Sequence, residues 1–147
     1  MEELRSTSMA KRRQIMITHT DRQRLGSLIQ NLEKVGYVER RYIDDLRDEL
    51  ERAEAVDSHE VLADVITMNS TARLRDLETG DTFDCTLVYP GEANADEDKV
   101  SILAPVGTAL LGYRVGDEIE WPIPAGVIRL KVEEVVYQPE RAGEYER

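Results

Sequence analysis

The sequence predicts an α+β protein in which a pair of helices precedes an antiparallel sheet. Between residues 21 and 53, apolar residues recur at spacings of three and four, which is typical of amphipathic helices. From Val65 onward the spacing changes to alternation, which is typical of strands. A chain of 147 residues with 41% hydrophobic residues can bury such a core unaided, and its single cysteine, Cys85, excludes an internal disulfide.

We expect three regions: a flexible tail over residues 1–14, a helical hairpin over residues 15–63 and a sheet domain over residues 64–147. The tail has no apolar core of signal-peptide length, and no later segment approaches the roughly 20 apolar residues that cross a bilayer. A cytoplasmic protein without a membrane segment is therefore predicted. The net charge of −11 argues against direct, sequence-specific nucleic-acid binding, which depends on neutralising phosphates with Lys and Arg.

The hairpin is predicted to begin with a short strand over residues 15–18. Its first helix is predicted over residues 21–33, because Thr20 and Gln23 have the spacing of a capping box and apolar residues follow at helical intervals. Gly36 interrupts this pattern before the second helical pattern begins. Each helix has one narrow apolar stripe and the connection is short, so the helices are predicted to pack antiparallel as a short coiled coil. At about 1.5 Å per residue, the arms would reach roughly 20 to 25 Å.

The sheet domain is predicted to contain five strands, over residues 72–77, 82–89, 99–103, 118–121 and 127–137. A tight turn joins the first two strands, and a longer acidic loop follows the second. The apolar residues of the last strand cannot all alternate strictly. A β-bulge is therefore expected near Glu133 and Glu134.

A single helical turn is predicted between the third and fourth strands. Pro105 fixes φ, Gly107 permits a tight start, and Thr108 can cap the Ala-Leu-Leu turn that follows. Gly112 suits the left-handed position that closes such a turn. Gly116 then marks the reversal into the next strand.

Residues 104–117 read A-P-V-G-T-A-L-L-G-Y-R-V-G-D. They resemble the C-terminal domain of the Gre transcript-cleavage factors of bacterial RNA polymerase, whose usual pattern is S-P-I-G-x-A-L-L-G-x-x-x-G-D. Ala104 and Val106 depart from that pattern conservatively. The resemblance implies an FKBP-like antiparallel sheet around a short helix, behind an N-terminal hairpin. Three further segments are similar to one branch of this family, the regulator of nucleoside diphosphate kinase: residues 65–70, 87–90 and 137–140.

In the Gre factors the hairpin enters the secondary channel of RNA polymerase, and two acidic residues at its tip help to hold a magnesium ion. Magnesium prefers hard oxygen ligands, which carboxylates supply. The family tip reads approximately G-D-L-x-E-N-x-E-Y, whereas this chain reads G-Y-V-E-R-R-Y from Gly36. If Gly36 is the matching glycine, Tyr37 and Arg40 occupy the two metal-holding positions, and neither can replace a carboxylate. Glu39 is the remaining acid, but two adjacent arginines oppose cation binding.

The resemblance therefore implies a polymerase-binding regulator that occupies the secondary channel without stimulating transcript cleavage. In the family the C-terminal domain docks at the channel entrance partly through the S-P-I segment, which corresponds here to Ala104, Pro105 and Val106. These three residues also fit a turn that positions core leucines, so a structural role stays open beside the docking role.

Other functions would need particular residues, which can be sought in the sequence. Direct action on nucleoside diphosphate kinase, which the name of the branch suggests, stays open, as does genuine transcript-cleavage activity. Prolyl isomerisation needs an aromatic-lined pocket, and the domain offers only Phe83, Trp121 and a few tyrosines. His19 and His59 lie in different segments beside helix ends and are not spaced as paired metal ligands. We expect no catalytic residue, metal or cofactor of the protein's own.

Overall fold

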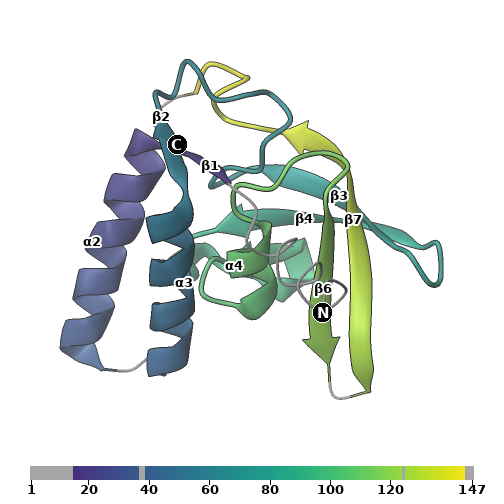
Figure 1. Cartoon of the computed structure of the whole chain (residues 1–147), viewed down its shortest axis with the longest axis horizontal. Helices are drawn as coiled ribbons and strands as arrows, with labels where there is room; N and C mark the ends of the chain where they lie inside the picture. Colours follow the sequence, from purple (N-terminus) through teal and green to yellow (C-terminus); the bar gives the residue numbers. More distant parts are fainter. Residues whose placement is uncertain (1–14, 37–38, 124, 145–147) are drawn as a thin grey trace, which may run out of the picture.

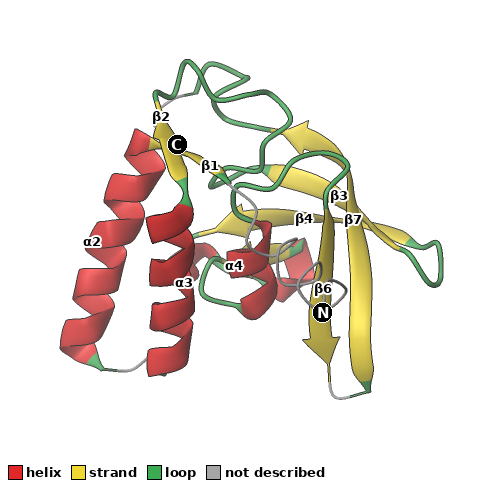
Figure 2. Ribbon diagram, viewed as in Figure 1, coloured by secondary structure: helices red, strands yellow, loops and turns green. Residues whose placement is uncertain are grey.

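A computed structural model describes residues 15–36, 39–123 and 125–144, with the backbone alone at residues 121–123. A helical hairpin stands beside a curled sheet, and a short helix lies between them (Figures 1 and 2). The helices are α2 (His19–Val35), α3 (Arg40–Arg52) and α4 (Pro105–Leu110), with 3-10 turns η1 (Pro90–Glu92) and η2 (Ala95–Glu97). The strands are β1 (Met16–Thr18), β2 (Glu54–Val56), β3 (Thr71–Asp76), β4 (Thr82–Val88), β5 (Lys99–Ser101), β6 (Glu118–Ile123) and β7 (Gly126–Tyr137). The predicted α+β class is confirmed.

The hairpin packs its two helices antiparallel, as their apolar stripes predict (Figure 1). The buried side chains of the stripes are Leu25 and Ile29 on α2 and Ile43, Leu46 and Leu50 on α3. The predicted start of the first helix is wrong. Thr18, not Thr20, is the N-cap, and its hydroxyl accepts a hydrogen bond from the Asp21 amide at 2.9 Å. The helix can begin two residues earlier because Thr18 ends a strand in the extended conformation that an N-cap requires.

A two-stranded parallel sheet forms the base of the hairpin, and only its first strand was predicted. β1 pairs with β2, so that Ile17 lies opposite Ala55. α3 ends at Arg52, and Ala53 adopts an extended conformation as its C-cap. Ala53 is nevertheless buried, so its spacing of three residues from Leu50 looks like a continuation of the apolar stripe of α3.

The larger sheet has the strand order β5-β4-β3-β7-β6. Its pairs are antiparallel except β4 with β5, which run parallel because residues 89–98 carry the chain back along the sheet. The predicted bulge in β7 is confirmed: Arg73 pairs with Glu134 while Leu74 pairs with Val132, which leaves Glu133 as the extra residue. The extra residue allows Val132 and Val135, three positions apart, both to be buried.

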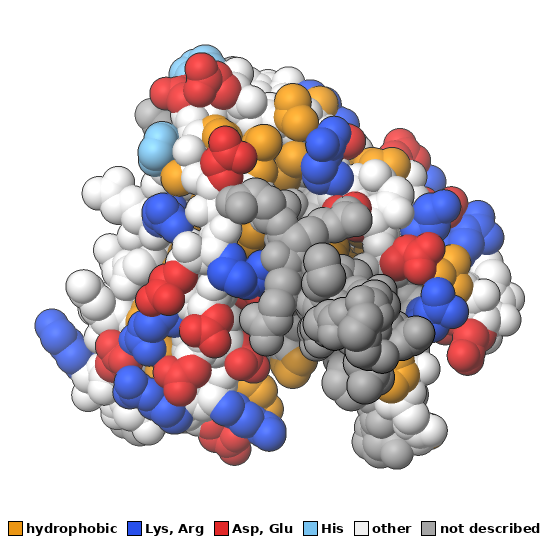
Figure 3. Space-filling model, in the orientation of Figure 1, with side chains coloured by type: hydrophobic (Ala, Val, Ile, Leu, Met, Phe, Trp, Pro, Cys, Tyr) orange, Lys and Arg blue, Asp and Glu red, His pale blue; other side chains and the backbone are white. Residues whose placement is uncertain are grey.

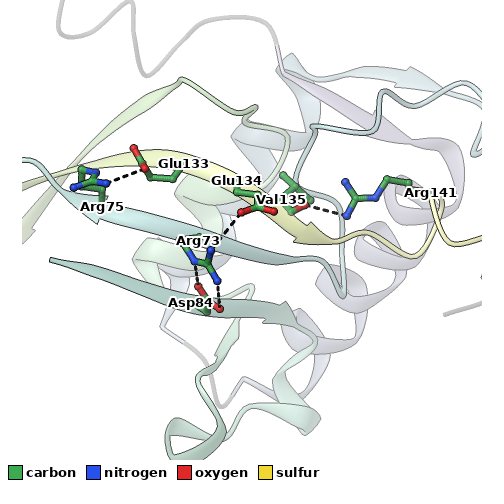
Figure 4. Close-up of polar contacts among 7 residues, drawn as sticks. All are labelled: Arg73, Arg75, Asp84, Glu133, Glu134, Val135 and Arg141. Atoms are coloured by element: carbon green, nitrogen blue, oxygen red, sulfur yellow. Dashed lines mark hydrogen bonds and ion pairs between the residues drawn. The ribbon is translucent and has the colours of Figure 1, made fainter. Parts of the chain in front are cut away.

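The outer face of this sheet carries ion pairs between neighbouring strands (Figure 4). Arg73 of β3 contacts Asp84 of β4 at 2.9 Å and Glu134 of β7 at 3.3 Å. Arg75 contacts Glu133 at 3.1 Å. The bulge thus places both glutamates opposite arginines on the solvent side.

α4 begins with Pro105 at its first position and Ala104 as the N-cap. The predicted capping role of Thr108 is wrong, because this residue lies inside the helix and its hydroxyl donates to the Ile102 carbonyl at 2.6 Å. A Cβ atom on Gly107 would lie 2.1 Å from the Ser101 carbonyl oxygen, so glycine permits this close packing. Gly112 has φ 82°, as predicted, and its Cα faces Ile15.

One continuous buried cluster contains residues of both the hairpin and the sheet. It includes Ile15, Leu25 and Leu46 together with Leu74, Leu110 and Val132. α4 lies against α3 and mediates part of this contact (Figure 1). Among the described residues, none of the helices combines the length and the apolar character that crossing a bilayer requires.

Candidate functional site

The hairpin bend is the first candidate site. Gly36 ends α2 with φ 76°, and its amide donates to the Leu32 carbonyl at 3.0 Å. Tyr37, which the sequence places at the tip, lies outside the described residues. Glu39 is the N-cap residue of α3 without a capping side-chain hydrogen bond, and Arg40 is the first helical residue. Both of these side chains are exposed.

Arginines and carboxylates are paired around this bend. Arg40 reaches across to Glu33 of α2 at 3.2 Å and along α3 to Asp44 at 3.4 Å. Arg47 also contacts both carboxylates, and its hydrogen bond to Glu33 raises the pKa of its guanidinium. These contacts join the two arms of the hairpin near its end.

A second pairing lies at the start of α3. Arg41 contacts Glu39 at 3.1 Å, and its guanidinium stacks on the Tyr42 ring at 4.9 Å from the centroid. Acidic and basic side chains are accordingly interspersed over the hairpin surface (Figure 3). The described carboxylates nearest the bend already face arginines, so a divalent cation would have to compete with guanidinium groups for them. In the described part of the chain, no group of three or more His, Cys, Asp or Glu side chains is arranged to hold a metal ion.

The second candidate site is the start of α4. Pro105 is exposed, Ala104 is half-buried, and Val106 is only 7% exposed and belongs to the core cluster. The structure therefore separates the three residues that the sequence grouped together. Pro105 is available to a partner, whereas the Val106 side chain packs α4 onto the rest of the molecule.

A third cluster was not predicted as a site. Asp21 lies in the first turn of α2 but is only 2% exposed, and its Oδ2 accepts a hydrogen bond from the Met68 amide at 3.0 Å. Burial raises the pKa of this carboxyl to about 7, and the nearby Glu140 carboxylate adds to the rise. Thr67 donates to Glu140 at 2.7 Å, which brings the segment 137–140 into the same cluster.

One signal in the sequence pointed toward this cluster. Residues 65–70 and 137–140 are two of the segments that resemble one branch of the family, and both contain polar residues that are buried, including Thr67, Ser70 and Gln138. Burial of a polar side chain requires a hydrogen-bonding partner, so such residues tend to be found together. Spacing alone did not show that Asp21 would meet them.

Comparison with known proteins places these features in context. The family described as "Transcription elongation factor, GreA/GreB, C-term" matches residues 61–137, and the family described as "Rnk N-terminus" matches residues 13–56. The chain is 43% identical over 132 residues to the "Regulator of nucleoside diphosphate kinase" of Escherichia coli K12, covering 89% of this chain and 95% of that protein. It is 31% identical over 140 residues to the transcription elongation factor GreA of Clostridium novyi, covering 91% of this chain and 87% of that protein.

A solved structure agrees with these matches. A prokaryotic transcription elongation factor GreA/GreB from Nitrosomonas europaea superposes with a TM-score of 0.71 at 46% sequence identity. The match covers 84% of this chain and 98% of that chain. Both the hairpin and the sheet are therefore shared with a relative of known structure.

Proposed function

Because the chain belongs to the GreA/GreB family of transcription elongation factors, we propose that it binds RNA polymerase at the secondary channel without stimulating transcript cleavage. The paired charges at the hairpin bend are the observation on which this proposal chiefly rests.

The hairpin arms are short. α2 has 17 residues and α3 has 13, which correspond to about 25 Å and about 20 Å of helix. Part of this length is used for packing within the molecule, because all five buried stripe residues, including Ile43 in the first turn of α3, belong to the common core. The part that projects is correspondingly shorter, and it suits occupation of the outer channel.

The chemistry of the bend supports binding in preference to catalysis. With Gly36 taken as the matching glycine, Arg40 occupies a position at which the family pattern has a metal-holding acid, and its side chain contacts Glu33 and Asp44. Glu39, the acid next to it, is paired with Arg41. A guanidinium is always protonated and cannot ligate a cation. We infer that Tyr37, Glu39 and Arg40 contact the walls of the channel and do not hold magnesium.

The start of α4 is proposed as the second contact with polymerase. Pro105 supplies an exposed, rigid apolar surface, and Ala104 lies beside it. Val106 contributes indirectly, because its burial fixes the orientation of α4. Since α4 lies against α3, this surface and the hairpin belong to one packed unit (Figure 1).

A crosslinking experiment tests the proposal. A photoreactive amino acid in place of Tyr37 is expected to crosslink to core RNA polymerase, and the same group in place of the exposed Thr82 on β4 is the matched control. The unmodified protein should associate with core polymerase at low salt and micromolar concentration. Lack of association under these conditions would overturn the proposal. If arrested transcripts in the polymerase complex are cleaved efficiently when this protein is the only factor added, it is instead a genuine cleavage factor.

Direct action on nucleoside diphosphate kinase is a second candidate, favoured by the name of the Escherichia coli relative. Mixing the two purified proteins in the absence of polymerase separates the possibilities. A stable complex would support direct action, whereas the absence of a complex would support regulation through transcription.

A further inference from the structure

Three segments meet where the hairpin joins the sheet domain: the first turn of α2, the turn at residues 67–70 and the C-terminal segment around residue 140. Asp21 of the first accepts from the Met68 amide of the second, and Thr67 of the second donates to Glu140 of the third at 2.7 Å. We call these four residues the clasp. The Asp21–Met68 bond is a polar link between the arm that carries the proposed tip and the sheet domain.

The middle segment of the clasp is held in a fixed shape. The Ser70 hydroxyl accepts from the Thr67 amide at 2.9 Å and lies 2.8 Å from the Thr67 hydroxyl. Asn69 has φ 68°, a conformation that residues other than glycine adopt infrequently. The Asn69 amide donates to the Leu87 carbonyl of β4 at 2.6 Å. The turn is thus anchored to the sheet and presents its Met68 amide to Asp21.

Two charged groups among the described residues shift the pKa of Asp21, one from the C-terminal segment and one from its own helix. Glu140 opposes ionisation of the carboxyl, and Arg24 of α2 favours it. Burial raises the pKa of the phenol of Tyr89, which follows β4, and the charges of Asp21 and Glu140 add to the rise. The Thr18 hydroxyl and the Met68 amide are the hydrogen-bonding partners of Asp21, and both favour its charged form. Burial outweighs these favourable contacts, so the closed clasp retains a proton that an exposed aspartate would lose.

We propose that the clasp is a proton-controlled attachment of the hairpin: it is closed when Asp21 is protonated, and it opens more readily when Asp21 and Glu140 are both charged. Opening moves the carboxyl into water, where it releases its proton to solvent. A rise in pH therefore shifts the equilibrium toward the open form. This property belongs to the fold itself and does not depend on polymerase binding.

Hydrogen exchange on the whole chain, followed by NMR from pH 5 to pH 8 and corrected for the intrinsic exchange rate, tests the proposal. The opening constant at the Met68 amide is expected to rise about tenfold per pH unit between about pH 5 and 6.5 and to level off as the pH passes about 7. Asp21→Asn should remove this dependence. Glu140→Gln should shift the levelling point to lower pH. Asp45→Asn, which removes a charge from the exposed side of α3, should leave the dependence unchanged.

Two outcomes would overturn the proposal. Equal slopes at Met68 in the unaltered protein and in Asp21→Asn would show that Asp21 does not control opening. Equal protection at Met68 and at Leu74 in the centre of the sheet would show that only whole-chain unfolding opens the contact. If Asp21→Asn does not fold, a carbon-13 titration of the Asp21 carboxyl in the unaltered protein decides, because a midpoint near 4 would contradict the proposal.

Discussion

Asp21 occupies a helix position at which a carboxylate usually faces solvent and is stabilised by the helix N-terminus. In this protein the same residue is buried, and removal from water dominates the favourable effect of the helix end. The sequence indicates the residue type and its place in the first turn. Only the packing of the turn at residues 67–70 over that helix end determines the protonation of its carboxyl.

Replacing Asp21 with Asn is expected to stabilise the protein at high pH. The folded-state pKa of about 7 exceeds the ordinary value of 3.8, so the stabilising contribution of Asp21 is fully present below about pH 4 and is lost as the pH rises toward 7. At pH 8 the variant should have a free energy of unfolding about 2–4 kcal/mol higher than the unaltered protein. The difference should disappear near pH 4. Urea unfolding across this pH range measures it, and a constant difference at every pH would contradict the assignment.

Gly107→Ala is expected to destabilise the fold by about 2–4 kcal/mol, because the new methyl group would overlap the Ser101 carbonyl oxygen and force α4 away from β5. Gly26→Ala on α2 is the matched control. It has open space around it and lies within a helix, so it should raise stability by up to about 1 kcal/mol. Urea unfolding of both variants tests the pair. A tolerated alanine at position 107 would show that α4 packs less closely than the structure indicates.

At the scale of elements, the ion pairs between the arms of the hairpin support a local prediction. Glu33→Gln removes the acid that Arg40 and Arg47 share. Because Arg40 is exposed and Glu33 and Arg47 are partly exposed, solvent screens these pairs and the free energy of unfolding should change little. Hydrogen exchange in the second turn of α3, where the amides first have helical acceptors, should become faster, since the arms lose their link near the bend. Asp48→Asn makes the same change of charge elsewhere on α3 and should leave that exchange unaltered.

The longer elements are those that the sequence predicts well. Both helices of the hairpin, β3, β4 and β7, and the bulge in β7 follow from local periodicity, because each buries one face. β2 was missed because three residues are too few to show a period and its partner, β1, is nearly 40 residues away. The start of α2 was misplaced because Thr18 and Thr20 are both suitable caps, and only the strand before Thr18 selects it.

Only those features of the candidate sites that depend on local sequence could be predicted. The sequence itself shows that arginines lie next to the bend. The structure places Pro105 on the surface, which a docking role requires. The burial of Val106 depends on α4 packing into the core cluster, which no local pattern reveals. The clasp depends on two long-range contacts. Asp21 and Met68 are 47 positions apart in the sequence, and Thr67 and Glu140 are 73 apart, so no local spacing pattern predicts either contact.

At the scale of the whole molecule, the hairpin and the sheet share one core, so the described arms of the hairpin and the start of α4 keep a set relation to each other. A partner that engages both surfaces gains from this preorganisation, because little conformational freedom is lost on binding. The net charge of −11 adds a constraint on the partner surface. It disfavours exposed phosphates and favours a protein surface with available basic groups.

Competition with a cleavage factor tests this arrangement directly. Increasing amounts of the protein are expected to slow cleavage of an arrested transcript by an acidic-tipped Gre factor, because both proteins would occupy the same channel. Pro105→Asp should require about tenfold more protein for the same inhibition, since a charge replaces an apolar contact. An aspartate at the first helical position suits the helix N-terminus, so the fold should be retained. Val127→Asp, at an exposed position on β7, should inhibit as the unaltered protein does. Inhibition that is equal for all three proteins would remove the start of α4 from the interface, and acceleration of cleavage would show that the bend supplies a catalytic acid after all.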